Sequence, residues 1–112
     1  MDKVTVIGGS GFLGSHVADE LSMRGYSVTV FDRTSSPWVR DDQRMVVGDL
    51  LDRSALVDVC KGARYVYHFA GVADIGEAKA NPYQTIKVNV LGTTAALEAA
   101  HHNQVERFVY AS

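Results

Sequence analysis

The 112-residue sequence has one cysteine, no run of basic residues and no long hydrophobic run, and each absence excludes a class of protein. Cys60 has no partner for an internal disulfide, and it lies in a segment of helical spacing where a small buried thiol is common. The formal net charge is −2, so neither nucleic acid nor an anionic membrane surface is an expected partner. Because no apolar run reaches about 18 residues, no membrane-spanning helix is predicted.

The first residues also lack the charged and then apolar pattern of a secretion signal, so we expect a cytoplasmic location. The hydrophobic content of 46% is sufficient for a packed core. The length predicts one globular domain over residues 1–112.

Short apolar segments alternate along the chain with segments of helical periodicity. Strands are predicted at residues 3–7, 27–32, 44–47, 64–70 and 107–110, and helices after Phe12, at 53–61 with Asp52 as N-cap, and from Asn81-Pro82 to about His101. The polar stretch 34–43 predicts a loop or a poorly formed helix. This alternation predicts an α/β fold, a Rossmann-type doubly wound parallel sheet of about five strands with helices on both faces. Complete domains of this kind commonly have six strands or more, so we expect the fold to be incomplete at the C-terminus.

The strongest functional signal is a glycine-rich loop between the first predicted strand and the first predicted helix. Residues 8–14 read Gly-Gly-Ser-Gly-Phe-Leu-Gly and, from Gly9, fit the pattern G-x-G-x-x-G. Such glycines allow a tight turn and close approach of the backbone to a pyrophosphate, whose charge the helix N-terminus attracts. A glycine-rich turn without a ligand is the alternative, and the absence of Gly-Lys-Ser/Thr excludes a Walker-type loop. The residues expected at the pyrophosphate are Gly8, Gly11, Phe12, Leu13 and Gly14.

Asp32 ends the second predicted strand, close to the spacing of about 20 residues at which such folds carry an acid for the adenosine ribose. Its carboxylate would accept hydrogen bonds from the ribose hydroxyls and repel a 2′-phosphate, which favours NAD over NADP. The neighbouring Arg33 weakens this preference. The alternative is that Asp32 only caps a loop.

With these motifs the chain resembles, over its whole length, the extended branch of the short-chain dehydrogenase/reductase family, which contains the NAD-dependent nucleotide-sugar epimerases and dehydratases. The similar segments are the glycine loop followed by Ser15-His16, Val47-Gly48-Asp49-Leu50, His68-Phe69-Ala70-Gly71 and Asn89-Val90-Leu91-Gly92-Thr93. Ile7 departs from the family, which usually has threonine there. The resemblance implies that NAD is the cofactor, with Asp49 and Leu50 at the adenine and Phe69, Ala70, Gly71 and Asn89 along the cofactor.

Each of these residues also has a purely structural interpretation. Asp49 could cap a loop, and His68 fits a packed histidine at a strand end better than a base. Asn89 falls on a predicted inward stripe of the helix, together with Ile86, Val90, Thr93 and Leu97. We therefore expect its amide to turn inward and to have a partner, since an unpaired buried polar group costs about 1–3 kcal/mol.

The resemblance implies the NAD-binding portion of an epimerase/dehydratase that acts on a nucleotide sugar through transient hydride transfer, and it admits a homodimer. Fold alone leaves two alternatives open. One is a non-catalytic NAD(P)-binding protein with a redox-sensing or regulatory role. The other is a hydroxysteroid or aldehyde-type reductase of the same branch.

Tyr83 and Lys87 have the Tyr-x-x-x-Lys spacing that this family uses for proton transfer, but we interpret them as an exposed helical pair. In the family, the catalytic serine or threonine and the Tyr-x-x-x-Lys pair follow the fifth strand, and the former is expected just beyond Ser112. We therefore assign no catalytic residue and no metal ligand, and expect the 112-residue chain alone to be inactive.

Overall fold

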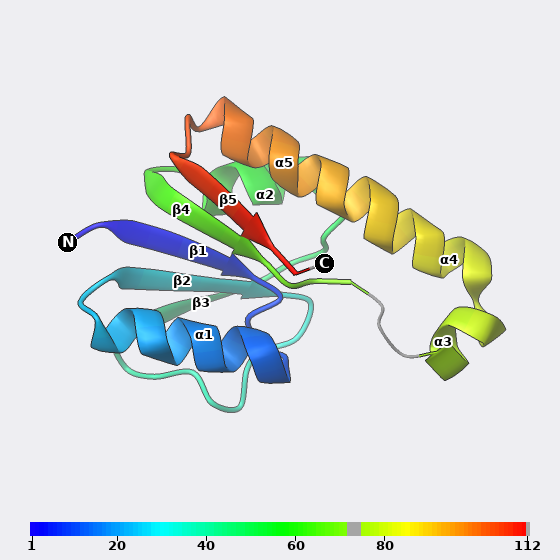
Figure 1. Ribbon diagram of the computed structural model, residues 1–112, viewed down its shortest axis with the longest axis horizontal. Coiled ribbons are helices and arrows are strands. Elements are labelled where there is room, and N and C mark those ends of the chain that lie inside the picture. Colours follow the sequence, from blue (N-terminus) through cyan, green and yellow to red (C-terminus); the bar gives the residue numbers. More distant parts are fainter. Residues whose placement is uncertain (72–74, 112) are drawn as a thin grey trace.

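The computed structural model describes residues 1–71 and 75–111, and in this part of the chain five parallel strands form one sheet (Figure 1). The strands are β1 (Lys3–Ile7), β2 (Ser27–Asp32), β3 (Gln43–Val47), β4 (Ala63–His68) and β5 (Arg107–Tyr110). Their order in the sheet is β3-β2-β1-β4-β5. The predicted fold class is confirmed, and the main difference in bounds is that β4 ends at His68 rather than at residue 70.

The central strands are apolar on both faces because helices cover both sides of the sheet. Val4 and Val6 of β1 are buried in the core cluster on one face of the sheet, whereas Ile7, at the end of the same strand, is buried in the cluster on the other face. A strand with buried residues on both faces is typical of a parallel sheet that helices cover on both sides.

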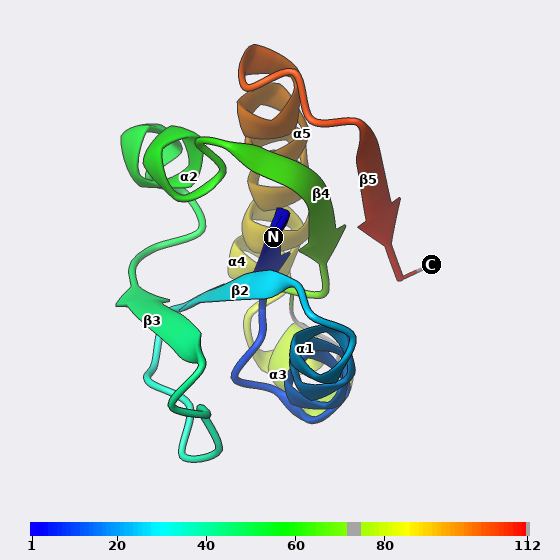
Figure 2. The ribbon, with the colours of Figure 1, turned by 90° about the vertical axis from the view of Figure 1, so that its left-hand side faces the viewer.

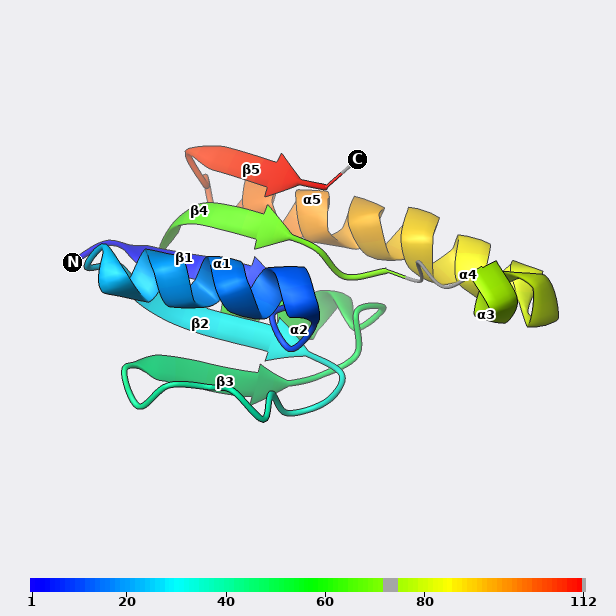
Figure 3. The same cartoon turned by 60° about the horizontal axis from the view of Figure 1, so that its bottom comes forward.

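Helix α1 (Phe12–Met23) packs on one face of the sheet, and α2 (Arg53–Val59) and α5 (Gly92–His102) pack on the other (Figures 2 and 3). Asp52 caps α2 as predicted, since its side chain accepts a hydrogen bond from the backbone N–H of Ala55 at 3.1 Å. Gly25 follows α1 with a φ of +94°, which places it in the left-handed region expected after a helix end.

The strand order reverses direction at β1, because the chain proceeds from β1 to β2 and β3 on one side and then crosses to β4 and β5 on the other. Ligands of open α/β sheets bind outside the carboxyl ends of the strands at such a switch point. The glycine loop follows β1, and residues 69–71 follow β4, so both predicted cofactor segments lie at this end of the sheet.

The predicted helix from Asn81 to about His101 is confirmed in its extent, because helical residues follow one another without a gap from Pro82 to His102, but its regularity was predicted wrongly. The structure instead has α4 (Pro82–Ile86), a π-helical turn η1 (Lys87–Leu91) and α5, and a short α3 (Ile75–Ala80) that the sequence analysis missed. Asn81 stands at the N-cap of α4 but makes no side-chain capping hydrogen bond. In the described part of the chain, no helix is both long enough and apolar enough to cross a membrane.

The predicted inward stripe of this region is wrong for its apolar members. Ile86, Val90 and Leu97 are 63%, 56% and 47% exposed. The buried face consists instead of Gly92, Ala96, Ala99 and Ala100. A search for large apolar side chains overlooks these small residues, and the π turn changes the angular phase between the residues before and after it.

Candidate functional site

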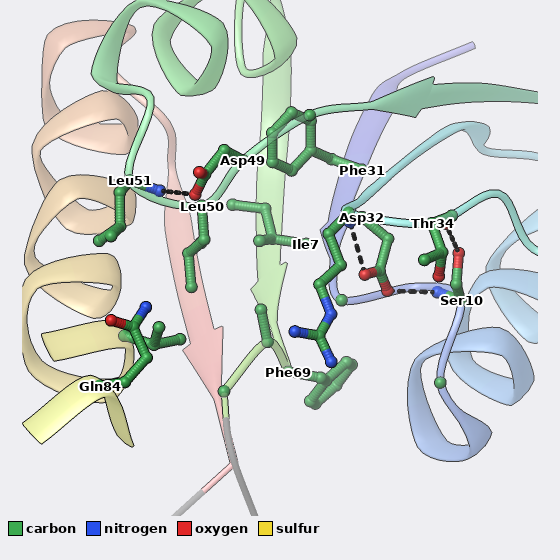
Figure 4. A pocket seen from close by; sticks show the side chains of 17 residues that line it. Ile7, Ser10, Phe31, Asp32, Thr34, Asp49, Leu50, Leu51, Phe69 and Gln84 are labelled. Carbon is green, nitrogen blue, oxygen red and sulfur yellow. Dashed lines mark hydrogen bonds between the residues drawn. The ribbon is translucent and has the colours of Figure 1, made fainter. Parts of the chain in front are cut away.

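A cleft of about 550 Å³ opens at the carboxyl ends of β1, β2 and β4 (Figure 4). Most of the predicted cofactor residues line it, from segments far apart in the sequence: Gly8, Gly11, Asp32, Arg33, Asp49, Leu50, Phe69, Ala70 and Gly71. Of the other predicted residues, Phe12, Leu13, Gly14 and Asn89 do not line the cleft. The fold thus brings the glycine loop and the two acidic positions to one concave surface.

Two glycines of the loop are required by the fold itself. Gly8 has a φ of +85°, and a Cβ there would collide with the backbone of Ala70. A Cβ on Gly14 would collide with the carbonyl oxygen of Gly8. These two positions keep the loop pressed against β4 and against the start of α1.

Gly11 is different, because the fold does not require a glycine at this position. Its φ is −78°, which any residue adopts, and among the described residues only the Gly8 carbonyl oxygen lies within 4 Å of an added Cβ, at 3.6 Å. Gly11 lines the cleft and is the N-cap of α1, with no side chain to cap the helix. The missing side chain therefore leaves open space at the positive end of a helix.

The Asp32 carboxylate is held by backbone groups on two sides. One oxygen accepts a hydrogen bond from the Ser10 N–H at 3.0 Å, and the other accepts one from the Arg33 N–H at 2.7 Å. The Ser10 hydroxyl donates to the Thr34 carbonyl at 2.8 Å, which ties the glycine loop to the segment after β2 a second time. Figure 4 shows Ser10, Asp32 and Thr34 together at one side of the cleft. A fixed carboxylate with free lone pairs suits recognition of hydroxyl groups.

Apolar side chains form the middle and the opposite side of the cleft. Leu50 packs against Gly92, where an added Cβ would collide with the leucine side chain. Phe31 packs against Gly48 in the same way, because a Cβ on Gly48 would lie 2.7 Å from the phenylalanine ring. The Asp49 carboxylate accepts a hydrogen bond from the Leu51 N–H at 2.8 Å, so it caps its own loop and also lines the cleft. Both interpretations of Asp49 therefore agree with the structure.

Phe12 and Leu13 are exposed on the first turn of α1, and Phe12 makes an edge-to-face contact with His16. Asn89 is half-buried in η1, and its Oδ1 lies 2.8 Å from where a Cβ of Gly71 would be. The expected inward orientation of Asn89 is thereby confirmed, although Asn89 lies behind Gly71, which lines the cleft, and does not line the cleft itself.

His68 is a packed histidine, as predicted. Its side chain is 4% exposed and stacks on Phe108, with ring centroids 5.9 Å apart, and burial lowers the pKa of the imidazole below its ordinary value. Tyr83 is 79% exposed, and neither Tyr83 nor Lys87 lines the cleft. Within the described ranges, no cluster of three or more His, Cys, Asp or Glu side chains could hold a metal ion.

Sequence reasoning missed eight residues that line the cleft: Ile7, Ser10, Phe31, Thr34, Gly48, Leu51, Gln84 and Val88. Ser10 occupies a variable position of the glycine motif, so only its hydrogen bonds reveal its role. Gln84 and Val88 lie one helical turn apart on α4 and η1, and they reach the cleft because this irregular helix lies beside Leu50 and Leu51 (Figure 4). The tertiary arrangement, rather than any local motif, determines these positions.

Comparison with known proteins agrees with this geometry. Residues 4–112 match the NAD dependent epimerase/dehydratase family. The chain is 36% identical over 110 residues to human sterol-4-alpha-carboxylate 3-dehydrogenase, decarboxylating, covering 98% of this chain and 28% of that protein. It is 32% identical over 119 residues to UDP-glucose 4-epimerase of Rhizobium leguminosarum bv. trifolii, covering 99% of this chain and 35% of that enzyme.

Among solved structures, UDP-glucose 4-epimerase from Brucella ovis in complex with NAD superposes with a TM-score of 0.91 at 33% identity, covering 100% of this chain and 36% of that one. A doubly wound fold with a cleft at its switch point is typical of nucleotide-binding proteins. The chain belongs to the NAD dependent epimerase/dehydratase family. It spans about a third of the length of these relatives.

Proposed function

We propose that this chain binds NAD and that the full-length protein is an NAD-dependent epimerase or dehydratase acting on a nucleotide sugar. The observation that carries the proposal is the cleft in which Gly11, at the N-terminus of α1, and the fixed carboxylate of Asp32 share one surface. A dinucleotide needs a place for a diphosphate and an acceptor for ribose hydroxyls, and these two elements supply them.

The residues present fit the cofactor. The open Cβ position of Gly11 leaves room for the diphosphate, and Phe12, Leu13 and Gly14 would present backbone N–H groups of the first helical turn to it. Asp32 and Arg33 would meet the adenosine ribose, and Asp49 and Leu50 the adenine. Phe69, Ala70 and Gly71 would line the path of the cofactor, with Asn89 behind them. Bound NAD would supply the hydride acceptor for oxidation of a substrate hydroxyl.

The nucleotide-sugar substrate is favoured by the UDP-glucose 4-epimerases among the relatives and solved structures. A second candidate is a hydroxysteroid-type dehydrogenase, which the 36% identity to the human sterol dehydrogenase favours. Both kinds of relative match the chain over nearly its whole length, so their shared part supports NAD binding more directly than either substrate. Fold alone does not separate the two.

Assays of the purified full-length protein with NAD⁺ would separate these reactions. UDP-glucose and UDP-galactose would be tested for interconversion, which involves no net reduction of NAD⁺. A 3β-hydroxysteroid and a sterol 4-carboxylate would be tested for net NADH formation at 340 nm. We expect interconversion without net NADH. Net NADH with a steroid only would replace the first candidate by the second, and binding of NAD without turnover of any nucleotide sugar or steroid would favour the redox-sensing alternative.

Three expectations from the sequence stay predictions within this proposal. They are a cytoplasmic location, a homodimer, and the absence of turnover by the 112-residue chain alone. The exclusion of nucleic acid as a partner likewise stays a prediction.

A further inference from the structure

A chain of hydrogen bonds runs from the end of β4 into the π-helical turn. His68 Nε2 lies 3.1 Å from Thr93 Oγ1, and the Thr93 hydroxyl donates to the backbone carbonyl of Asn89 at 2.6 Å. Because the single hydroxyl proton of Thr93 is used toward Asn89, the oxygen of Thr93 acts as acceptor toward His68. His68 is therefore the Nε2–H tautomer in this arrangement.

The other nitrogen of the ring, Nδ1, has no hydrogen-bond partner among the described residues. His68 is only 4% exposed, so this nitrogen is buried. A buried nitrogen without a partner costs free energy. An apolar side chain stacked on Phe108 would avoid this cost, so packing alone does not account for a histidine here. The bond from Nε2–H to Thr93 is the one polar contact that the imidazole makes in the described structure.

The far end of this chain of bonds is the turn that carries Asn89. Residues Lys87–Leu91 form a π helix. Thr93 and Thr94, in the first turn of the following α5, bond back to the carbonyls of Asn89 and Val90 four residues earlier. Side-chain bonds of this kind bend helices, and π turns inside α-helices occur often at functional sites. The Asn89 Oδ1 lies 2.8 Å from where a Cβ of Gly71 would be, so a side chain at Gly71, whose φ is +150°, would collide with it.

We propose that His68 is a positioning residue: through Thr93 it holds the π turn in the register that presses Asn89 against Gly71, and so sets the β4 rim of the cofactor cleft. Gly71 and the preceding Ala70 and Phe69 line the cleft, whereas His68 and Thr93 do not. The inference rests on the proposed binding of NAD, because it assigns to His68 an effect on that site.

The test is a double-mutant cycle in the full-length protein, with the dissociation constant of NAD⁺ measured by calorimetry after removal of bound nucleotide. Thr93→Val keeps the shape of the side chain and removes both bonds. We expect it to weaken NAD⁺ binding about tenfold, as loss of about one hydrogen bond in a positioning chain would. In an Asn89→Ala background the same change should weaken binding less than twofold, because Asn89 no longer transmits the effect.

Two matched variants separate positioning from general stability. Thr93→Ser retains the hydroxyl, and His68→Gln places an amide N–H near the position of Nε2–H, so both should bind NAD⁺ within about threefold of the parent. His68→Leu removes the donor and should behave like Thr93→Val; it replaces Thr93→Val in the cycle if that variant does not fold. Melting temperatures without NAD⁺ are measured for every variant.

Equal losses of NAD⁺ affinity from Thr93→Val in the parent and Asn89→Ala backgrounds would overturn the inference, and so would unchanged affinity in both Thr93→Val and His68→Leu. A lower melting temperature with unchanged affinity would reduce His68 to a packing residue and also overturn it. Failure of the parent itself to bind NAD⁺ would instead overturn the proposed function, so the two failures are distinguishable.

Discussion

The carboxylate of Asp32 accepts a hydrogen bond from the backbone N–H of Ser10 at 3.0 Å, so the acid at the end of β2 is fixed to the glycine loop after β1. Because this hydrogen bond fixes its orientation, the carboxylate cannot easily rotate away from a 2′-phosphate on the adenosine ribose. The close approach of two negative charges is unfavourable in a partly buried site. Selectivity for NAD should therefore depend on this one side chain.

Asp32→Asn should reduce the preference for NAD⁺ over NADP⁺ at least tenfold, since the amide removes the negative charge and still offers an oxygen to one backbone donor. Dissociation constants of both dinucleotides, measured for parent and variant, check this. Asp41→Asn makes the same charge change in the exposed loop after β2 and should leave the ratio unchanged. Comparable affinities of the parent for the two dinucleotides would show that Arg33 compensates and that Asp32 does not select the cofactor.

Tyr83→Phe should change the turnover rate of the full-length protein less than twofold. The phenol is 79% exposed on α4 and lies outside the cleft, so it cannot reach a group that reacts there. Lys87→Met provides a second test of the same pair. A rate loss of several hundredfold in Tyr83→Phe, with NAD affinity and melting temperature unchanged, would identify Tyr83 as the catalytic tyrosine after all.

His68 should make the free energy of unfolding depend on pH in acid solution. Burial lowers the pKa of the folded imidazole below its ordinary value of 6.5, so the unfolded chain takes up a proton at a higher pH than the folded chain. Stability is therefore full above about pH 6.5 and falls as the pH decreases toward the folded pKa, by at most about 1.4 kcal/mol per pH unit.

Denaturant unfolding of the parent and of His68→Gln at pH 7.5 and 5.5 measures this effect. The difference between the two proteins isolates His68, because the other titrating groups are common to both. The variant should lose less stability on acidification than the parent. Equal losses in the two proteins would mean that His68 titrates as it does in water.

The fold and one side of the cleft were predictable because local rules determine them. Apolar segments that alternate with helical periodicity permit few arrangements other than a parallel sheet with covered faces. The glycine spacing and the position of Asp32 follow from the geometry of a strand, a tight turn and a helix, all within about 30 residues. The structure brings these residues to one cleft, and their binding to NAD stays a prediction.

The other side of the cleft was not predictable by such rules. The π turn at Lys87–Leu91, which contains Val88, does not follow the period of 3.6 residues per turn, so a search for that period does not predict that Val88 lines the cleft. Position 92 requires a glycine because any larger residue would displace the side chain of Leu50, which lies more than 40 residues earlier in the chain. Contacts between distant segments decide these positions, and one sequence does not reveal them.

The binding of NAD at the glycine loop is tested most directly by comparing substitutions of two glycines at the opposite ends of α1. The dissociation constant of NAD⁺ and the free energy of unfolding would be measured for Gly11→Ala, Gly11→Leu and Gly25→Ala. Gly11 has an ordinary φ, lines the cleft and has open space at its Cβ position, whereas Gly25 has a φ of +94° and does not line the cleft.

We expect Gly11→Ala to weaken NAD⁺ binding at least tenfold and Gly11→Leu to abolish it, each with a change of stability below about 1 kcal/mol, because the fold does not need this glycine. Gly25→Ala should show the reverse pattern, with about 1–2 kcal/mol of stability lost to left-handed strain and NAD⁺ affinity unchanged. If Gly11→Leu folds and titrates NAD⁺ as well as the parent does, the diphosphate does not lie at this loop and the account is contradicted.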